Sequence, residues 1–356
     1  MCFVATHGIW FVLAPTEPDE LRRAATHPKS TVSAHNWLHR MEGPMIARNV
    51  EVSRRQAVRL GTLGVATALL PSPAAAQPTG SARMLTRPIP RTGEQLPVVG
   101  IGTWQTFDVG NGLADLDQRK QVLSILFEAG GRVIDSSPMY GRAEAVVGTL
   151  LKDMRAHDKA FLATKVWTSG EASGAAQMNS SFVKFQAPVI DLMQVHNLVD
   201  WRVHLKTLRA WTEQKRYRYI GLTHYTVPAL DDLAAIIKAE PVDFLQFGYS
   251  INRREAEARL LPLAAERGVS VIVNQPFDSG SLFAQSKGKT VPEWAAEFDC
   301  TSWAQFYLKF ILGHPAVTCV IPGTARPDHA RDNVAGLGRL PDEAMRRRMI
   351  AHWEGL

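Results

Sequence analysis

Cysteine is scarce in this chain, and its scarcity excludes two kinds of site. Among 356 residues there are three cysteines, Cys2, Cys300 and Cys319, with no C-x-x-C motif. A disulfide framework or a thiolate metal centre needs cysteines clustered at short spacings. We therefore expect neither of them, and we expect Cys319, which lies in the apolar run VTCVI, to be a small core residue.

A strong excess of one charge and a long apolar run are also missing. The net charge is +6, of which residues 1–76 carry +3, so residues 77–356 are nearly balanced. This balance gives no case for a nucleic-acid partner. The apolar stretch 60–70 is shorter than the roughly 20 residues that a membrane-spanning helix needs, so we expect no stable membrane insertion.

The N-terminal part of the chain has the succession of segments that is typical of an export signal: a basic segment, an apolar segment and a run of small residues. Ser53-Arg54-Arg55-Gln56 precedes the apolar stretch 60–70, and the small residues Ala74-Ala75-Ala76 follow. The segment resembles a twin-arginine (Tat) signal, which implies the Tat translocase as a transient partner and a periplasmic location. We expect a signal peptide at 45–76, cleaved after Ala76, and a non-native extension or disordered segment at 1–44. The alternative is a basic, Ala-rich leader on a cytoplasmic protein.

After residue 77 the chain alternates between strand and helix patterns. Amphipathic segments such as 117–130, 204–216 and 227–240 separate short runs rich in β-branched or aliphatic residues. The segment 170–187 is rich in Gly, Ser and Ala, so we expect a short or frayed helix there. The expected strands are 97–102, 132–137, 160–167, 189–196, 219–224, 243–250, 269–276 and 317–323.

Eight strands, each followed by a helix, predict a single-domain (β/α)8 TIM barrel at 77–356. An open Rossmann sheet is disfavoured, because Gly100-Ile101-Gly102 has no third glycine and no helix start after it. The stretch before the first strand predicts a hairpin with its turn at Thr92-Gly93, which would close the bottom of the barrel.

Four residues at expected strand ends suggest proton transfer to a substrate oxygen. Asp135 and Tyr140 flank the end of the second strand, Lys165 is near the end of the third, and His196 ends the fourth. A free phenol titrates near about 10, and a nearby ammonium held by a carboxylate favours its ionised form. Barrel chemistry lies at the carboxyl ends of strands, so this set suggests carbonyl reduction.

The motifs that surround these residues resemble those of the aldo-keto reductases over residues 84–340. They are GIGTW (100–104), D-S-S-x-x-Y-G (135–141), ATKVW (163–167), QVHN (194–197), GLTHY (221–225) and IPGTARPDHARDN (321–333). The resemblance implies NAD(P)H-dependent, reversible reduction of an aldehyde or ketone. Tyr140 would be the general acid, Lys165 would lower its pKa, Asp135 would pair with Lys165, and His196 would orient the carbonyl.

The resemblance also implies residues that contact the cofactor and the substrate. Trp104 and Trp167 would line the pocket for a small carbonyl substrate. His224 and Asn274 stand where the family has Asn and a stacking Tyr, and Gly323 and His329 replace two usual cations. Arg326 favours NADP(H) over NAD(H). The implied cofactor contacts are Thr223, His224, Gln246, Asn274, Thr324, Arg326, Asp332 and Asn333.

We expect a monomer, and three other functions stay open as alternatives. The departures at His224 and Asn274 motivate a non-catalytic NADP(H)-binding accessory or sensor protein on the same barrel. Lys165 would serve a Schiff-base aldolase if its amine were neutral. A metal hydrolase is the weakest alternative, because the histidines lack a clustered carboxylate–histidine pattern, and we expect no metal.

Overall fold

A computed structural model of the chain describes residues 84–335 and 338–356, all within the compact unit Pro73–Leu356. The extension expected at 1–44, the signal expected at 45–76 and the cleavage site after Ala76 lie outside these residues. Within the described part, no helix is both long and apolar enough to cross a bilayer.

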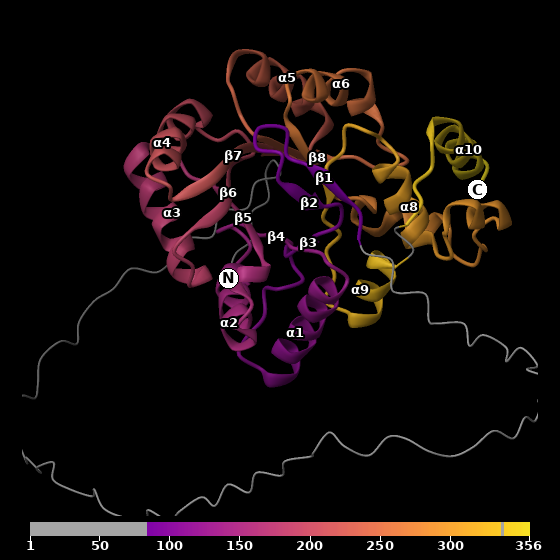
Figure 1. The fold of residues 1–356 in the computed structure, drawn as a ribbon, viewed down its shortest axis with the longest axis horizontal. Helices are drawn as coiled ribbons and strands as arrows, with labels where there is room; N and C mark the ends of the chain where they lie inside the picture. The colour runs from indigo at the N-terminus through magenta and orange to yellow at the C-terminus, as the bar shows by residue number, and fades with distance from the viewer. Residues whose placement is uncertain (1–83, 336–337) are drawn as a thin grey trace, which may run out of the picture. The chain divides into compact units, whose positions relative to one another are not determined.

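The described residues form an 8-stranded parallel sheet that follows the order of the sequence (Figure 1). Backbone pairing of Val99 with Val320 and of Gly102 with Gly323 joins the first strand to the last and closes the barrel. The predicted (β/α)8 fold is therefore confirmed. The strands are β3 (Ile101–Gly102), β4 (Val133–Asp135), β5 (Phe161–Val166), β6 (Ile190–His196), β7 (Tyr217–His224), β8 (Phe244–Gly248), β9 (Ser270–Asn274) and β10 (Cys319–Val320).

Helices follow the strands along the chain and surround the sheet, with α10 at the periphery, and most of them bury apolar side chains on their inner face (Figure 1). Side chains cap two of them: Ser302 accepts from the Gln305 amide at the start of α8, and Asp342 accepts from the Met345 amide at the start of α10. The helices are α1 (Leu113–Glu128), α2 (Ala143–Met154), α3 (Glu171–Phe185), α4 (Trp201–Glu213), α5 (Leu230–Ala239), α6 (Leu260–Glu266), α7 (Ser281–Gln285), α8 (Trp303–Leu312), α9 (Pro327–Val334) and α10 (Glu343–Glu354).

The expectation of a short helix at 170–187 is wrong, because α3 runs unbroken for 15 residues. Its small residues serve close packing between helices. A Cβ on Gly174 would overlap the His204 ring of α4, and a Cβ on Gly148 of α2 would overlap the backbone at the end of α3. Tight contact with both neighbours stabilises a helix that intrinsic propensity alone disfavours.

A hairpin closes the amino-terminal end of the barrel, as expected. Strands β1 (Thr86–Pro88) and β2 (Gln95–Pro97) pair antiparallel around Gly93, whose φ is +73°. Ile89 and Leu96 of this hairpin share one buried cluster with barrel-wall residues such as Phe161 and Cys319. The expected strand 97–102 is split, since Pro97 belongs to the hairpin. Substrate access is therefore left to the opposite end of the barrel.

Candidate active site

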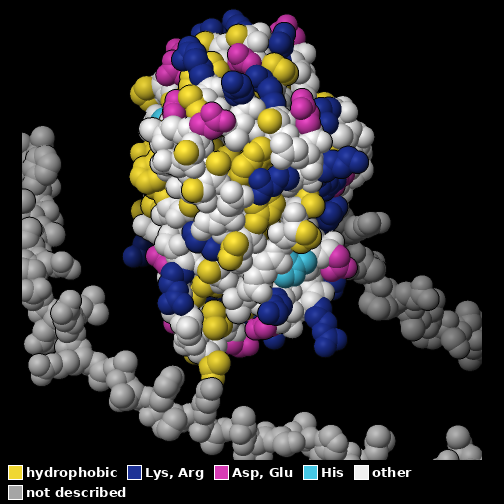
Figure 2. Space-filling view, turned by 90° about the vertical axis from the view of Figure 1, so that its left-hand side faces the viewer, with side chains coloured by type: hydrophobic (Ala, Val, Ile, Leu, Met, Phe, Trp, Pro, Cys, Tyr) yellow, Lys and Arg dark blue, Asp and Glu magenta, His cyan; other side chains and the backbone are white. Residues whose placement is uncertain are grey.

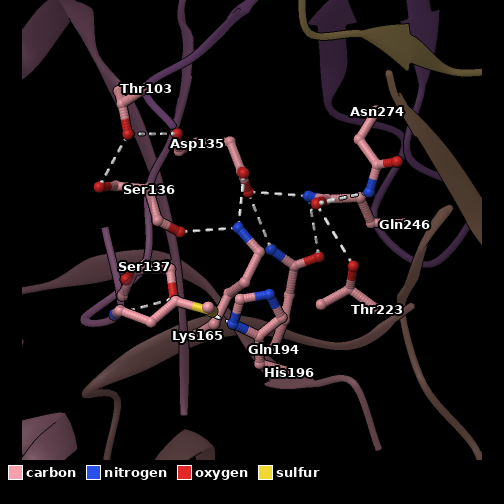
Figure 3. Close-up of polar contacts among 12 residues, drawn as sticks. Thr103, Asp135, Ser136, Ser137, Lys165, Gln194, His196, Thr223, Gln246 and Asn274 are labelled. Atoms are coloured by element: carbon pink, nitrogen blue, oxygen red, sulfur yellow. Dashed lines mark hydrogen bonds and ion pairs between the residues drawn. The ribbon is translucent and has the colours of Figure 1, made fainter. Parts of the chain in front are cut away.

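A buried ion pair lies at the carboxyl ends of β4 and β5. Lys165 Nζ donates to Asp135 Oδ2 at 2.6 Å and to the Ser136 carbonyl oxygen at 2.7 Å (Figure 3). The Lys165 side chain is 0% exposed and that of Asp135 3%. Burial lowers the pKa of Lys165, but the charge and hydrogen bond of Asp135, together with the interaction with Tyr140, outweigh burial and raise the pKa overall. Lys165 is therefore a fixed ammonium ion.

Two glutamine side chains complete the coordination of the Asp135 carboxylate. Gln246 Nε2 donates to Asp135 Oδ1 at 2.8 Å, and Gln194 Nε2 donates to the same oxygen at 3.1 Å (Figure 3). Asp135, Gln194 and Gln246 are almost wholly buried. The ammonium and both amides donate to the carboxylate, so Asp135 is held as an anion without solvent.

The amide network continues towards β9. Gln246 Oε1 accepts from Thr223 Oγ1 and from Asn274 Nδ2, both at 3.3 Å (Figure 3). Asn274 Oδ1 is buried and has no hydrogen-bond partner among residues 84–335 and 338–356. A buried carbonyl oxygen without a donor costs free energy, so this atom is available to a ligand that carries an N–H group. The set of two amides and a hydroxyl suits a carboxamide such as that of nicotinamide.

Tyr140 lies in the turn between β4 and α2 and faces two other members of the expected set, Lys165 and His196. Lys165 Nζ is 5.1 Å from the centre of its ring, and the His196 ring is 5.9 Å away, edge to face. The structure thus brings Asp135, Tyr140, Lys165 and His196 together. The pKa of Tyr140 is raised: burial is the largest cause and Asp135 adds to it, while Lys165 opposes both.

The direction of this shift differs from the sequence-based expectation of a lowered pKa. Lys165 does lower the pKa of Tyr140, as expected, but the sequence could not show how deeply the phenol is buried. The net effect keeps the phenol protonated at neutral pH. A protonated phenol next to an ammonium ion can give up its proton and leave a stabilised phenolate.

His196 ends β6 with its ring wedged beside Tyr140 and Trp167. Its Nδ1 lies 3.0 Å from Ser137 Oγ, and the Trp167 ring centre is 6.4 Å from its own. Burial, the Lys165 charge and His224 lower the pKa of His196 to about 2. The imidazole is therefore neutral at physiological pH, with one N–H to donate.

The two expected pocket tryptophans are exposed at the carboxyl ends of their strands. Trp104, after β3, is 49% exposed, and Trp167, after β5, is 42% exposed. Met139 and Tyr225, which follow β4 and β7, are exposed as well. Trp167 approaches His196, whereas no ring contact joins Trp104 to the set within the described residues. Large apolar side chains of four strand ends are thus open to solvent on the side of the barrel that carries the set.

His224, expected to contact the cofactor, ends β7 and is half-buried. Its Nδ1 accepts from the backbone N–H of Thr226 at 3.3 Å, and its ring stacks on Tyr225. Burial lowers the pKa of His224. The ring is therefore held by its own loop rather than by the amide network.

The remaining expected cofactor residues lie after β10, and three of them are already engaged. Arg326 forms a bidentate ion pair with Asp328, with both side chains largely exposed. Thr324 Oγ1 accepts from the Arg326 backbone N–H at 3.0 Å, and Asp332 Oδ1 accepts from Gln305 Nε2 at 2.7 Å. Asn333 is buried in α9. The structure does not bring this group into contact with the Asp135 network.

Sequence reasoning missed Gln194, Ser136 and Ser137. Gln194 lies two residues before His196 on β6, and Ser137 lies two residues after Asp135. Alternate residues of a strand share a face, so this spacing was a usable signal for both. Ser136 takes part through its backbone carbonyl, which no residue-type pattern can reveal.

The described surface also has a cleft away from this network. It has a volume of about 810 Å³ and lies at the amino-terminal end of the barrel, lined by residues such as Pro90, Arg91 and Val269. It is therefore far from the buried ion pair in the architecture of the barrel. No cluster of three possible metal ligands occurs in residues 84–335 and 338–356. On the face drawn in Figure 2, basic side chains lie among acidic and hydrophobic ones.

Comparison with known proteins agrees with this arrangement. A sequence model of the aldo/keto reductase family matches residues 98–348. Aldo-keto reductase YhdN of Bacillus subtilis is 25% identical over 223 residues, which are 58% of this chain and 65% of that protein. This chain thus spans just under two thirds of that relative's length. Methylglyoxal reductase DkgA of Yersinia pestis is 29% identical over 257 residues, 68% of this chain and 83% of that protein.

A third relative and two solved structures extend the comparison. The NADH-specific methylglyoxal reductase of Escherichia coli is 23% identical over 313 residues, 70% of this chain and 92% of that protein. Aldo-keto reductase AKR11C1 of Bacillus halodurans has a TM-score of 0.61 at 21% identity, covering 76% of this chain and 96% of that one. An aldo-keto reductase of Klebsiella pneumoniae in complex with NADPH has a TM-score of 0.61 at 20% identity, covering 73% and 92%.

The structural matches support the fold, and the family model spans the strands that carry the buried ion pair and the neutral histidine. The chain therefore belongs to the aldo/keto reductase family of NAD(P)H-dependent oxidoreductases.

Proposed function

We propose that this chain reduces an aldehyde or ketone to an alcohol, reversibly, with Tyr140 as the general acid. The observation that carries the proposal is the fully buried Lys165 ammonium, held by Asp135 and facing the Tyr140 ring at 5.1 Å. A charged lysine next to a protonated phenol is an arrangement that favours release of the phenolic proton.

Each side chain has a separate task in this proposal. The nicotinamide, when bound, supplies a hydride to the carbonyl carbon. The C=O π electrons then move to the oxygen, which takes the proton from Tyr140 Oη. Lys165 stabilises the phenolate that remains, and Asp135 keeps Lys165 charged and in place. His196, being neutral, donates a hydrogen bond that orients the carbonyl and polarises it.

We propose that Thr223, Gln246 and Asn274 hold the nicotinamide carboxamide. Their chemistry fits that group, because Asn274 Oδ1 is a buried acceptor for which the described part of the chain supplies no donor. His224, at the end of the same β7 strand as Thr223, would border it. Asn274 replaces the aromatic stack of the family pattern with a hydrogen-bonding amide, so affinity would come from polar contacts in place of stacking.

We propose that the adenosine end of the cofactor lies against Thr324, Arg326, Asp332 and Asn333, and that NADP(H) is preferred over NAD(H). The exposed guanidinium of Arg326 supports this preference, because it can pair with a 2′-phosphate. Relatives differ in this respect: the Escherichia coli relative is NADH-specific by name, and the Klebsiella pneumoniae structure contains NADPH.

For the substrate we propose a small carbonyl compound whose apolar part contacts Trp104 and Trp167. Their exposure and the approach of Trp167 to His196 support this placement. The names of two relatives point to methylglyoxal as one compound to try.

The test is NADPH oxidation by the purified full chain with a panel of aldehydes and ketones that includes methylglyoxal. We expect turnover with at least one of them. Tight NADPH binding without turnover on any of them would instead indicate a non-catalytic binding protein. Covalent trapping of a carbonyl on Lys165 by borohydride would indicate an aldolase, although a fully buried ammonium with two hydrogen bonds is a poor amine nucleophile.

We also propose that residues 45–76 direct export by the Tat route and that the mature protein is a periplasmic monomer. Mass spectrometry of the native protein from the exported fraction tests this, because cleavage after Ala76 leaves Gln77 as the first residue. A protein that keeps residues 45–76 and stays in the cytoplasm would contradict the proposal.

A further inference from the structure

Ser137 is a fully buried hydroxyl whose contacts single it out among the residues around His196. It lies two residues after Asp135, and its Oγ is 3.0 Å from His196 Nδ1 (Figure 3). The backbone N–H of Met139 also donates to Ser137 Oγ, at 3.4 Å. The proposed carbonyl reduction assigns tasks to Tyr140, Lys165, Asp135 and His196, and it leaves Ser137 without a role.

The protons of this contact can be counted. A serine hydroxyl has one proton to donate, and Ser137 Oγ already accepts from Met139. In the part of the chain that the structure describes, His196 Nδ1 is the one acceptor within hydrogen-bond distance of that hydroxyl. If Nδ1 carried the imidazole proton, the buried Ser137 proton would have no acceptor, which is unfavourable.

The imidazole has one proton to place, because the surroundings of His196 keep it neutral. Burial is the main cause, since the Tyr140 and Trp167 rings lie beside the imidazole, and the charges of Lys165 and His224 add to it. With Nδ1 accepting from Ser137, this proton resides on Nε2. No described residue forms a hydrogen bond with Nε2, so its N–H is free for a substrate oxygen.

We propose that Ser137 is a positioning residue that holds His196 in the tautomer protonated at Nε2. The other tautomer would present the lone pair of Nε2 to the carbonyl oxygen and repel it. The catalytic consequence rests on the proposed carbonyl reduction, whereas the tautomer itself is a property of the protein without substrate. An experiment can therefore contradict the tautomer assignment without contradicting the proposed carbonyl reduction, and the reverse also holds.

The direct test is NMR of the full chain labelled with ¹⁵N-histidine, with the His196 signals assigned by their loss in His196→Asn. We expect a pyridine-like Nδ1 and a pyrrole-like Nε2 in the wild type. The reverse pattern in the wild type would overturn the proposal, and this measurement needs no Ser137 variant to fold.

Substitution of Ser137 gives a second test of the tautomer assignment. Ser137→Ala should shift the His196 nitrogen signals towards a mixture of tautomers, and Ser137→Thr, which keeps the hydroxyl, should restore them. Ser136→Ala is the matched control, because Ser136 is equally buried and its hydroxyl contacts Thr103, not His196. A His196 spectrum that is the same in Ser137→Ala and in the wild type would contradict the assignment.

Kinetics connect the tautomer to the reaction. Ser137→Ala should lower kcat for carbonyl reduction about tenfold, with the Kd for NADPH unchanged, and Ser137→Thr should recover most of the loss. An unchanged kcat in a variant with an altered tautomer would refute the catalytic consequence. A wild type that reduces no carbonyl would refute the proposed function, with the NMR result still deciding the tautomer.

Discussion

The two ends of the proposed site differ in how firmly the fold holds their charged side chains. At β4 and β5, Lys165 and Asp135 are sealed from solvent and each is held by further hydrogen bonds. After β10, Arg326 and Asp328 form their ion pair with both side chains about 60% exposed. A buried pair is fixed by the fold, whereas an exposed pair can rearrange at little cost. The proposed proton-transfer end is therefore preorganised, and the proposed adenosine end would take its final arrangement from the cofactor.

Gln246 joins the buried ion pair to the residues that we propose for the nicotinamide carboxamide. Its Nε2 contacts Asp135, and its Oε1 accepts from Thr223 and Asn274. A carboxamide bound by Asn274 would thus be three hydrogen bonds away from Asp135, by way of Asn274 and Gln246. In our proposal, binding of the cofactor and the orientation of the Lys165–Asp135 pair would be connected through these two amide side chains.

The largest effect is expected from Lys165→Met, which breaks the preorganised end. Loss of the ammonium should lower kcat/KM for reduction by about 10³-fold. It also leaves Asp135 as an uncompensated buried carboxylate, which should destabilise the fold by about 3–5 kcal/mol. Steady-state kinetics and denaturant unfolding measure the two effects.

Two further variants turn this prediction into a comparison. The double variant Lys165→Met/Asp135→Asn should recover stability without recovering activity, because it removes the unpaired charge. Arg326→Met, at the exposed end, should leave the free energy of unfolding unchanged within error. A Lys165→Met protein as stable as the wild type would show that the buried pair is not a fixed element of the fold.

The second prediction concerns pH. Reduction requires the protonated phenol, so activity is lost as pH rises through the pKa of Tyr140. Because burial raises that pKa above its usual value of about 10, the loss should fall at high pH. His196, with a pKa of about 2, stays neutral throughout the working range. We expect a kcat/KM profile that is level from about pH 6 to 8. A loss of activity centred near about 6.5, the usual histidine value, would contradict this.

The third prediction tests whether Asn274 binds the nicotinamide carboxamide through a hydrogen bond. Asn274→Leu removes the buried acceptor that no described residue satisfies, and it should raise the Kd for NADPH about tenfold. Quenching of tryptophan fluorescence measures binding without any need for turnover. Asn179→Leu, on α3, is the matched control and should bind as the wild type does. Equal affinities of the two variants would exclude Asn274 from the cofactor site.

The smallest effect is expected from Asp328→Asn at the exposed end. Removal of this carboxylate releases Arg326 from its ion pair and lowers the repulsion of a 2′-phosphate. The ratio of kcat/KM with NADPH to kcat/KM with NADH should rise about threefold. A ratio that moves towards NADH would place the 2′ position of the ribose elsewhere.

Much of the fold was predictable because strands buried on both faces read as continuous apolar runs, as in 160–167 and 269–276. The helix α3 was not, since Gly174 and Gly148 stabilise it through close contact between helices, which local composition does not report. At the site, the positions of Asp135, Tyr140, Lys165 and His196 at the ends of successive expected strands were enough to predict that they lie together. Gln194 and Ser137 were missed although their two-residue spacing from the expected site residues was visible.

The pairings after β10 were beyond prediction for a different reason. Arg326 with Asp328 and Asp332 with Gln305 depend on side-chain orientations in a loop and a short helix, where no periodic pattern determines direction. Whether the pKa of Tyr140 is raised or lowered likewise depends on how deeply the phenol is buried, which only the packed barrel determines.

The most direct test of the proposed acid is a single-turnover measurement with Tyr140→Phe, which removes only the phenolic oxygen. With enzyme-bound NADPH and a carbonyl that the wild type reduces, the rate constant for NADPH oxidation should fall by at least about 10³-fold. The Kd for NADPH should stay within about twofold of the wild-type value. A Tyr140→Phe rate constant within about tenfold of the wild type would contradict the assignment of Tyr140 as the proton donor.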